Sequence, residues 1–280
     1  MPDRAQRRRR TPVLTFASGK GGVGKSNIVA NLACLLSKGG RRILVLDGDL
    51  GLANIDVLFG ISPRLTIGHF LEGTHSLDDV AIEGPHGLRL IPAASGVAAL
   101  ALLDPAQEAR LAVSLHAIGE SHELTLIDGP AGISGSVSSL ARLADAVAIV
   151  TSPEPTAMVD AYALAKILHR EDPGRRLALV VNNTRDAAEG ERIHHQLDRI
   201  THRFLGKGIS YWGHVVQDDA VVSAVQEQRP VVDLYPQSRA SRSLEALALR
   251  IAAEARLGSA FTAAAISPAL HAAPGLEIVH

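Results

Sequence analysis

The sequence predicts an α/β fold with a mostly parallel, doubly wound sheet. Short apolar runs rich in β-branched residues recur along the chain, and stretches of helix length separate them. Such runs are typical of strands buried on both faces, and a helix between successive strands makes those strands parallel. The chain has 280 residues, of which 46% are hydrophobic, which is enough for one large domain with a substantial core.

The expected elements alternate along the chain between strand and helix. We expect strands at residues 13–17, 42–47, 88–92, 124–128, 146–151 and 177–182, with a further strand near 209–216. Helices are expected at 26–38, 105–119, 134–144, 156–171, 187–205 and 241–257. The last helix favours packing against the core over anchoring in a membrane, because one face carries Leu244, Leu247, Ala248, Ile251 and Ala255.

The two ends of the chain differ in composition from the domain at residues 12–257. Residues 1–11 are basic and are expected to form a flexible tail, with contact to an anionic surface as the alternative. Residues 258–280 are rich in alanine and proline and are also expected to be flexible.

The first junction of strand and helix carries a phosphate-loop motif. Residues 19–26 read Gly-Lys-Gly-Gly-Val-Gly-Lys-Ser and match the pattern G-x-x-x-x-G-K-[ST]. The glycines let successive N–H groups point inward, and the positive end of the helix adds to the attraction for phosphate. Lys25 is expected to reach the β- and γ-phosphates, and Ser26 to hold a magnesium ion. The expected nucleotide contacts are Gly19, Lys20, Gly21, Gly22, Val23, Gly24, Lys25, Ser26 and Asn27.

Polar residues end three other expected strands. Asp47 and Asp49 follow the second strand, Asp128 ends the strand at 124–128, and Asn182 ends the strand at 177–182. The carboxyl ends of parallel strands meet at the ligand-binding edge of a sheet. We expect Asp49 to position the attacking water and Asp128 to hold a magnesium-bound water. Asp47 either assists or caps the next helix, and Asn182 either binds the edge of adenine or forms a turn.

The expected metal ligands are therefore Ser26, Asp47 and Asp128. The segment after Asp128, Gly-Pro-Ala-Gly, is expected to move in response to the γ-phosphate.

Composition excludes several classes of protein. The formal net charge of −1 predicts no specific nucleic-acid partner. A single cysteine, Cys34, excludes a disulfide framework and a cysteine-only metal site within one chain, and we expect it to be buried. The adjacent His194 and His195 do not share a helix face, so a solvated surface is favoured over a metal site.

Together these residues resemble the MinD/ParA family of dimerising ATPases, whose phosphate loop carries an extra lysine at the position of Lys20. Within that family, the chain is similar to the branch that sets flagellar number, FlhG or FleN. The similar segments are residues 46–58, 83–88, 91–96, 153–156, 160–164 and 228–232. The resemblance runs from about Val13 to about Ala255 and implies a MinD-like ATPase domain.

The resemblance implies an ATP-dependent homodimer in which Lys20 of each subunit contacts the nucleotide of the other. Lys20, Lys25 and Asp49 would act in slow, partner-modulated hydrolysis of ATP to ADP, with Mg²⁺, and Asn182 would bind adenine. It also implies a cytoplasmic protein with peripheral contact at the inner membrane or cell pole. Its partner would be a flagellar-placement GTPase of the signal-recognition type, or a flagellar transcription or switch component.

The chain departs from the flagellar branch at four places. One is the C-terminal membrane helix, which is usually clearer in those relatives than anything after Ser241 here. The GTPase-stimulating element of those relatives is reduced here to Asp3, Ala5 and the arginines around them. Val216 stands where proline is usual, and Gly48 stands where alanine is common, a difference expected to matter little.

Three alternatives remain for the function. One is a MinD/ParA-type ATPase that positions division, a chromosome or another polar cargo. A second is an iron–sulfur carrier, which the lone Cys34 opposes because such carriers use paired cysteines. The third is a non-hydrolysing scaffold, which the presence of Asp49 and Asp128 opposes.

Overall fold

A computed structural model describes residues 11–49, 55–94, 103–133 and 135–257 and confirms the predicted fold class. In these residues an eight-stranded sheet has the order β3-β4-β2-β5-β1-β6-β7-β8, and every pair is parallel except β3 with β4. The strands are β1 (Val13–Ser18), β2 (Ile43–Asp47), β3 (Ile82–Glu83), β4 (Arg89–Ile91), β5 (Leu124–Ala131), β6 (Ala146–Thr151), β7 (Arg176–Thr184) and β8 (Ser210–Val216).

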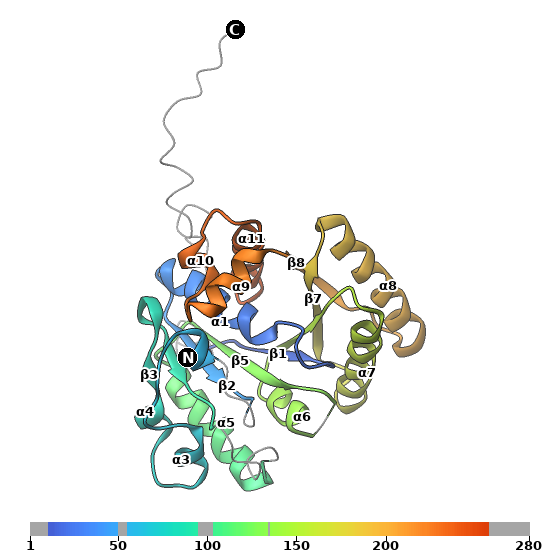
Figure 1. Ribbon diagram of the computed structural model, residues 1–280. Coiled ribbons are helices and arrows are strands. Elements are labelled where there is room, and N and C mark those ends of the chain that lie inside the picture. Colours follow the sequence, from blue (N-terminus) through green and yellow to red (C-terminus); the bar gives the residue numbers. More distant parts are fainter. Residues whose placement is uncertain (1–10, 50–54, 95–102, 134, 258–280) are drawn as a thin grey trace, which may run out of the picture.

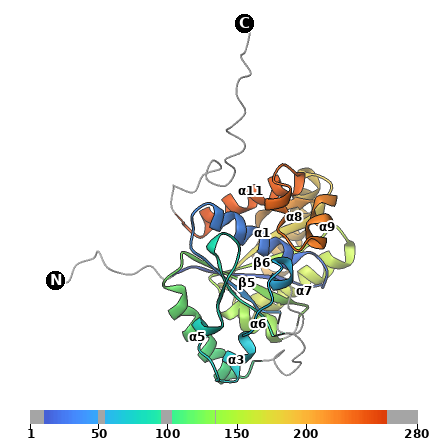
Figure 2. The ribbon, with the colours of Figure 1, turned by 60° about the vertical axis from the view of Figure 1, so that its left-hand side comes forward.

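Helices cover both faces of the sheet (Figure 1). They are α1 (Lys25–Lys38), α2 (Ile55–Leu58), α3 (Ile67–Leu71), α4 (Leu77–Val80), the 3-10 turn η1 (Pro85–Gly87), α5 (Pro105–Gly119), α6 (Gly135–Arg142), α7 (Pro155–Glu171), α8 (Ala187–Leu205), α9 (Asp219–Gln226), α10 (Val231–Leu234) and α11 (Arg239–Glu254). Helices α1 and α9–α11 pack on one face, and α3–α8 pack on the other. Figure 2 shows α1, α9 and α11 above the sheet and α3, α5 and α6 below it.

Alternation along each strand divides the core between these two faces. In β1, Leu14 and Phe16 pack under α1 and α11, whereas Val13 and Ala17 face the helices on the other side. The predicted stripe of α11 is confirmed as a core-packing face, since its five apolar residues are all buried. Helix α11 begins at Arg239, earlier than expected, because Ser238 caps it by accepting the N–H of Ser241.

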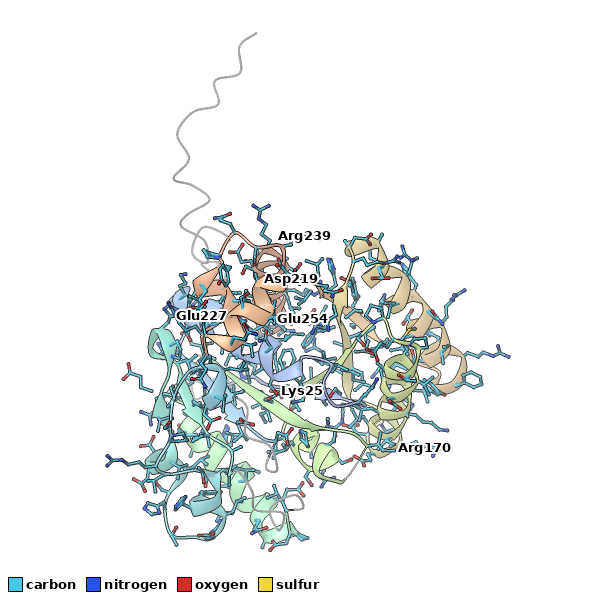
Figure 3. The ribbon with its side chains drawn as sticks, in the orientation of Figure 1. Lys25, Arg170, Asp219, Glu227, Arg239 and Glu254 are labelled. Carbon is cyan, nitrogen blue, oxygen red and sulfur yellow. The ribbon has the colours of Figure 1, made fainter. Side chains whose placement is uncertain are left out.

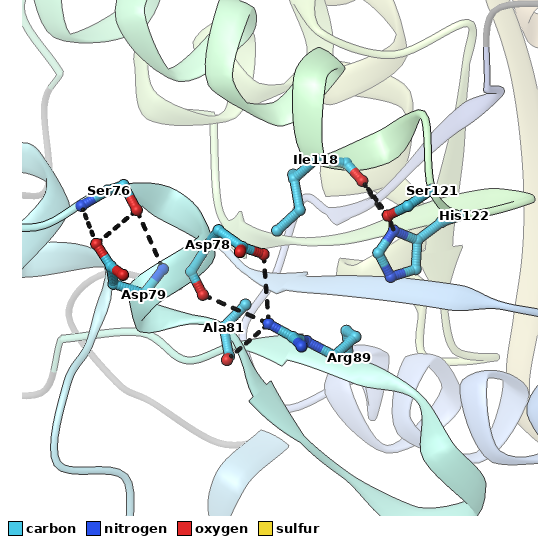
Figure 4. A network of polar contacts seen from close by, with 8 residues as sticks. All are labelled: Ser76, Asp78, Asp79, Ala81, Arg89, Ile118, Ser121 and His122. Atoms are coloured by element: carbon cyan, nitrogen blue, oxygen red, sulfur yellow. Dashed lines mark hydrogen bonds and ion pairs between the residues drawn. The ribbon is translucent and has the colours of Figure 1, made fainter.

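The edge of the sheet beside β4 contains short elements that the sequence did not reveal. Ser76 and Asp79 form a capping box around α4, each side chain accepting the other's backbone N–H (Figure 4). Arg89 on β4 donates to the carbonyl oxygens of Asp78 and Ala81, which joins α4 to the sheet. With four residues in α4 and two in β3, neither element is long enough to show a hydrophobic period.

Strand β5 runs past its expected end. It continues from Asp128 through Ala131, and the N–H of Gly132 donates to the carbonyl of Ser18 at 2.8 Å. The register shifts between Phe16 and Ser18, so that Ser18 pairs with Ala131. Most of the Gly-Pro-Ala-Gly segment is therefore sheet and is hydrogen-bonded to the start of the phosphate loop. Its expected movement in response to the γ-phosphate stays a prediction.

The two predicted tails lie outside the described residues. These are the basic tail, of which only Thr11 is described, and the segment 258–280. None of the described helices has the length and apolar content needed to cross a membrane.

Candidate nucleotide-binding site

The phosphate loop joins the end of β1 to the start of α1. Gly22 and Gly24 have φ angles of 78° and 86°, left-handed values that residues with a Cβ rarely adopt. A Cβ at Gly24 would also overlap the amide nitrogen of Asn182, near the end of β7. This nitrogen donates a 2.7 Å hydrogen bond to the carbonyl of Val23. The Asn182 side chain of β7 thus holds the loop in place. It lies so close to position 24 that only glycine fits there.

The lysine of the motif lies against the carboxylate of β5, near the centre of the molecule (Figure 3). Nζ of Lys25 is 2.5 Å from Oδ1 of Asp128 and 3.4 Å from Oγ of Ser26. The side chains of Lys25 and Asp128 are 5% and 0% exposed, so water screens the pair little. Burial raises the pKa of Asp128, although Lys25 and Ser26 favour its charged form. Three residues predicted to act together therefore lie in one place.

The donor atoms at this place fit a magnesium ion. Oδ2 of Asp128 is buried and has no hydrogen-bond partner within the described residues. A carboxylate and the Ser26 hydroxyl are the hard oxygen ligands that Mg²⁺ prefers. The part of the chain that the structure describes holds no group of three or more His, Cys, Asp or Glu residues suited to a metal. Mg²⁺ would therefore take its other ligands from phosphate and water, as it usually does.

Asp47 lies next to Asp128 on the neighbouring strand, with the two residues in register. Its side chain is fully buried, and its two oxygens accept the N–H groups of Asp49 at 3.2 Å and Ile55 at 3.1 Å. These bonds tie both ends of the connection between β2 and α2. The geometry gives Asp47 a role in shaping the connection that carries Asp49, and its role as a metal ligand stays a prediction.

Gly48 in the same connection lies close to β5 and α6. The N–H of Gly48 donates to the carbonyl of Asp128 at 2.8 Å. A Cβ at Gly48 would lie 3.0 Å from that oxygen and would overlap the buried side chain of Leu140. The expectation that glycine in place of alanine matters little stays a prediction, because the nearest atom to an added Cβ is the end of the Leu140 side chain on α6. Asp49 follows, half-buried, and its role in positioning water stays a prediction.

The second lysine of the loop points away from the Lys25 site. Nζ of Lys20 is 2.6 Å from Oε2 of Glu154 and 3.3 Å from Oγ1 of Thr156, at the start of α7. The Lys20 and Glu154 side chains are 40% and 64% exposed, so this pair lies on the surface. Glu154 and Thr156 were not predicted to belong to the site, because nothing in their spacing links them to the phosphate loop. Their contacts hold Lys20 at a surface where a second molecule can reach it.

A hollow of about 410 Å³ lies beyond Asn182, at the carboxyl ends of β7 and β8. It is lined by Arg185, Gln217, Asp218, Asp219 and Arg239. Asn182 itself is buried and is not among the residues that line this hollow. The predicted contact of Asn182 with adenine stays a prediction; what the structure adds is that its amide nitrogen already donates to the loop.

The predictions for Cys34 and for the two adjacent histidines were confirmed in part. Cys34 is a free, buried thiol as expected, and burial raises its pKa. His195 is exposed as expected, but His194 is half-buried. Nε2 of His194 lies 2.8 Å from the carbonyl of Ile209, and its ring stacks on Tyr211. The expectation of a solvated face is therefore wrong for His194, because α8 turns it towards β8.

The sequence is similar to that of a known protein family and to several of its members. The profile described as the CobQ/CobB/MinD/ParA nucleotide binding domain matches residues 14–231. The antiactivator FleN of Pseudomonas aeruginosa is 41% identical over 239 residues, which cover 85% of each chain. The flagellum site-determining protein YlxH of Helicobacter pylori is 33% identical over 239 residues, covering 85% of this chain and 81% of its own.

Solved structures share the fold. The cell division ATPase MinD of Pyrococcus furiosus superposes with a TM-score of 0.74 at 23% identity, over 87% of this chain and 99% of its own. MinD of Pyrococcus horikoshii, solved with Mg-ADP, gives a TM-score of 0.75 at 23% identity, over 88% of this chain and 98% of its own.

Proposed function

Because the chain belongs to the CobQ/CobB/MinD/ParA nucleotide-binding family, we propose that it is an ATP-dependent dimerisation switch that regulates flagellar number or placement. The flagellar part of this proposal is supported by two relatives, one named an antiactivator and the other a flagellum site-determining protein. Both align over more than four fifths of this chain, so the similarity extends well beyond the phosphate loop.

The observation that carries the proposal is that the two lysines of the phosphate loop lie in different environments. Lys25 is buried against Asp128 and Ser26, where phosphate and Mg²⁺ would bind. Lys20 lies at the surface beside Glu154, facing away from that site. A lysine in this position serves a nucleotide bound to another subunit, since two γ-phosphates that face each other need extra positive charge between them.

The residues of the site support hydrolysis by positioning and charge. Backbone N–H groups of the loop and the N-terminus of α1 hold the phosphates, and Lys25 neutralises charge on the transferred group. Ser26 and Asp128 would hold Mg²⁺, which would supply further neutralisation of phosphate charge. Asp49 orients the attacking water, and Asp47 holds the backbone of Asp49 in place. The short pairing of Ser18 with Ala131 links the loop to the segment after Asp128.

We infer two kinds of partner besides a second copy of the chain. An antiactivator acts on an activator, so the relative's name favours a flagellar transcription component. A placement GTPase of the signal-recognition type would need the reduced element around Asp3, which lies outside the described residues. Peripheral contact with the inner membrane or the cell pole belongs to the same proposal.

A second candidate is a MinD-type ATPase that positions the division site or another cargo. It is favoured by the septum site-determining protein MinD of Bacillus subtilis, which is 30% identical over 246 residues. That identity is lower than the 41% shared with the antiactivator, so the flagellar function is the stronger candidate.

The test is a gene deletion in the host, complemented with wild type or with Lys20→Ala. Flagella per cell are counted by electron microscopy, and cell length and septum position are scored in the same cells. We expect altered flagellar number or placement that only the wild type restores. Unchanged flagella with misplaced septa would contradict the flagellar function and favour the second candidate.

A further inference from the structure

One buried side chain joins the phosphate-loop helix to a distant segment of the chain. Asn31 lies in the second turn of α1, the helix that follows the phosphate loop, and is 1% exposed. Its Oδ1 accepts the backbone N–H of Val232 at 3.2 Å. Its Nδ2 donates to the backbone carbonyl of Asn27 at 2.8 Å and to the side-chain Oδ1 of Asn27 at 3.1 Å. All three contacts of this amide are therefore made within the protein.

The contact with Val232 decides which way the amide of Asn31 is turned. A backbone N–H can only donate, so the atom that faces Val232 is oxygen and the atom that faces Asn27 is nitrogen. Because Asn31 donates, the side-chain atom of Asn27 that meets it must be the acceptor, Oδ1. The other end of the Asn27 amide, Nδ2, is then left as a donor with no acceptor among the described residues.

Asn27 stands in the first turn of α1, directly after Lys25 and Ser26. The N-terminal turn of a helix attracts anions, and a side-chain donor in that turn adds to the attraction. An amide oxygen turned towards a phosphate would repel it, whereas an amide nitrogen would donate a hydrogen bond to it. The orientation of this amide therefore decides whether Asn27 helps or hinders nucleotide binding.

We propose that Asn31 is a positioning residue of the nucleotide site, which turns the Asn27 amide so that Nδ2 donates to the bound nucleotide. The orientation comes from α10, because the N–H of Val232 fixes Asn31. This inference rests on the proposed function, since it needs a nucleotide at the phosphate loop.

The segment that fixes Asn31 is itself held in place. Val232 is buried, and Oγ of Ser241 on α11 donates to the carbonyl of Val231 at 3.3 Å. The next residue, Asp233, lies 2.8 Å from Nε2 of His86 and 3.5 Å from Nζ of Lys38. Asn31 thus takes its orientation from an N–H group anchored on three sides, and not from α1 alone.

The test is a double-mutant cycle on the full-length protein. Binding of fluorescent ATP and ADP analogues with Mg²⁺ is titrated for wild type, Asn27→Ala, Asn31→Ala and the double variant. The loss of one hydrogen bond to a nucleotide predicts about 5- to 10-fold weaker binding for each single variant. Because Asn31 acts through Asn27, we expect the double variant to bind no more weakly than Asn27→Ala alone.

Ser37→Ala is the matched control. Ser37 is also buried on α1, and its hydroxyl has no hydrogen-bond partner within the described residues, but it lies at the far end of the helix. We expect its nucleotide affinity to match the wild type. Melting temperatures measured for every variant separate a loss of stability from a loss of binding.

A second measurement does not depend on the fold of the Asn31 variant. The side-chain NH₂ resonance of Asn27, assigned by its absence in Asn27→Ala, should shift when Mg-ADP is added to the wild type. A resonance that does not move overturns the inference, as does an equal loss of affinity for Asn31→Ala in both backgrounds. A wild type that binds no nucleotide overturns the proposed function as well, and this outcome is distinct from the other two.

Discussion

Nζ of Lys25 lies 2.5 Å from Oδ1 of Asp128, and both side chains are buried. The lysine that the motif assigns to phosphate therefore also neutralises a carboxylate that forms no other ion pair within the described residues. In a buried pair, removal of one member leaves the other as an uncompensated charge. Any variant of Lys25 consequently changes the stability of the protein as well as its affinity for nucleotide.

Lys25→Ala should lower the free energy of unfolding by about 3 kcal/mol, because Asp128 stays buried without its partner. Adding Asp128→Asn removes the stranded charge and should restore about 2 kcal/mol of this loss. Nucleotide binding should be lost in both variants. Urea denaturation and nucleotide titration measure the two effects separately. Equal stability of the single and the double variant would contradict this account of the pair.

Lys20→Ala should leave stability and ATP affinity nearly unchanged but should alter the kinetics of hydrolysis. Its ion pair with Glu154 is exposed and contributes about 1 kcal/mol or less, so stability should hardly change. Affinity for ATP should stay within about threefold of wild type, whereas hydrolysis should no longer rise with protein concentration. ATPase rates over a dilution series test this, with Glu154→Ala as the control that breaks the same pair but leaves Lys20 in place. A concentration-dependent rate in Lys20→Ala would show that Lys20 does not serve a second subunit.

Gly24→Ala should abolish nucleotide binding because its Cβ would displace the Asn182 amide that braces the loop. Gly40→Ala is the matched control. Gly40 has a similar φ, 81° against 86°, but nothing lies within 4 Å of its Cβ position. The control should lose about 1 kcal/mol of stability from backbone strain and bind nucleotide normally. If both variants bound equally well, the brace from Asn182 would be unnecessary.

Asp218 should make the free energy of unfolding depend on pH in the acidic range. Burial tends to raise its pKa, but N–H donors of Ala220, Ala240 and Arg239 outweigh this effect and lower the pKa below 3.8. The ionised side chain therefore contributes stability that is fully present above pH 3.8 and is lost as the pH falls through the lowered value.

Two variants of Asp218 check this assignment. Asp218→Ala removes a cap shared by α9 and α11 and should lower the free energy of unfolding by about 1–2 kcal/mol at pH 7. Asp218→Asn should keep much of the cap. The stability difference between wild type and Asp218→Asn should shrink as urea curves are measured from pH 5 down to pH 3. A difference that grows towards low pH would show that the sign is wrong.

The sequence was sufficient for the architecture because its elements are long and regular. The strand at Ala146–Thr151 and the helices α5 and α8 begin and end where the hydrophobic pattern places them. The short elements α2, α3, α4, α9 and α10 were missed because four to eight residues do not show a period clearly. Their positions depend on tertiary contacts such as that of Arg89 with Ala81.

The site could be predicted only where its residues lie in one contiguous segment of the chain. The phosphate loop is contiguous, so Lys25 and Ser26 could be placed from the motif. The pairing of Lys20 with Glu154 and the contact of Asn31 with Val232 join residues far apart in sequence. Nothing in the spacing of these residues indicates the contacts, because crossover connections decide which segments meet at the carboxyl edge of the sheet.

The central claim is that the nucleotide decides whether two copies of this chain associate. The most direct test is light scattering coupled to size-exclusion chromatography, with Mg²⁺ and either ADP or a slowly hydrolysed ATP analogue. The account predicts a monomer with ADP, a dimer with the ATP analogue, and a monomer in both cases for Lys20→Ala. The same mass with either nucleotide in the wild type would contradict it.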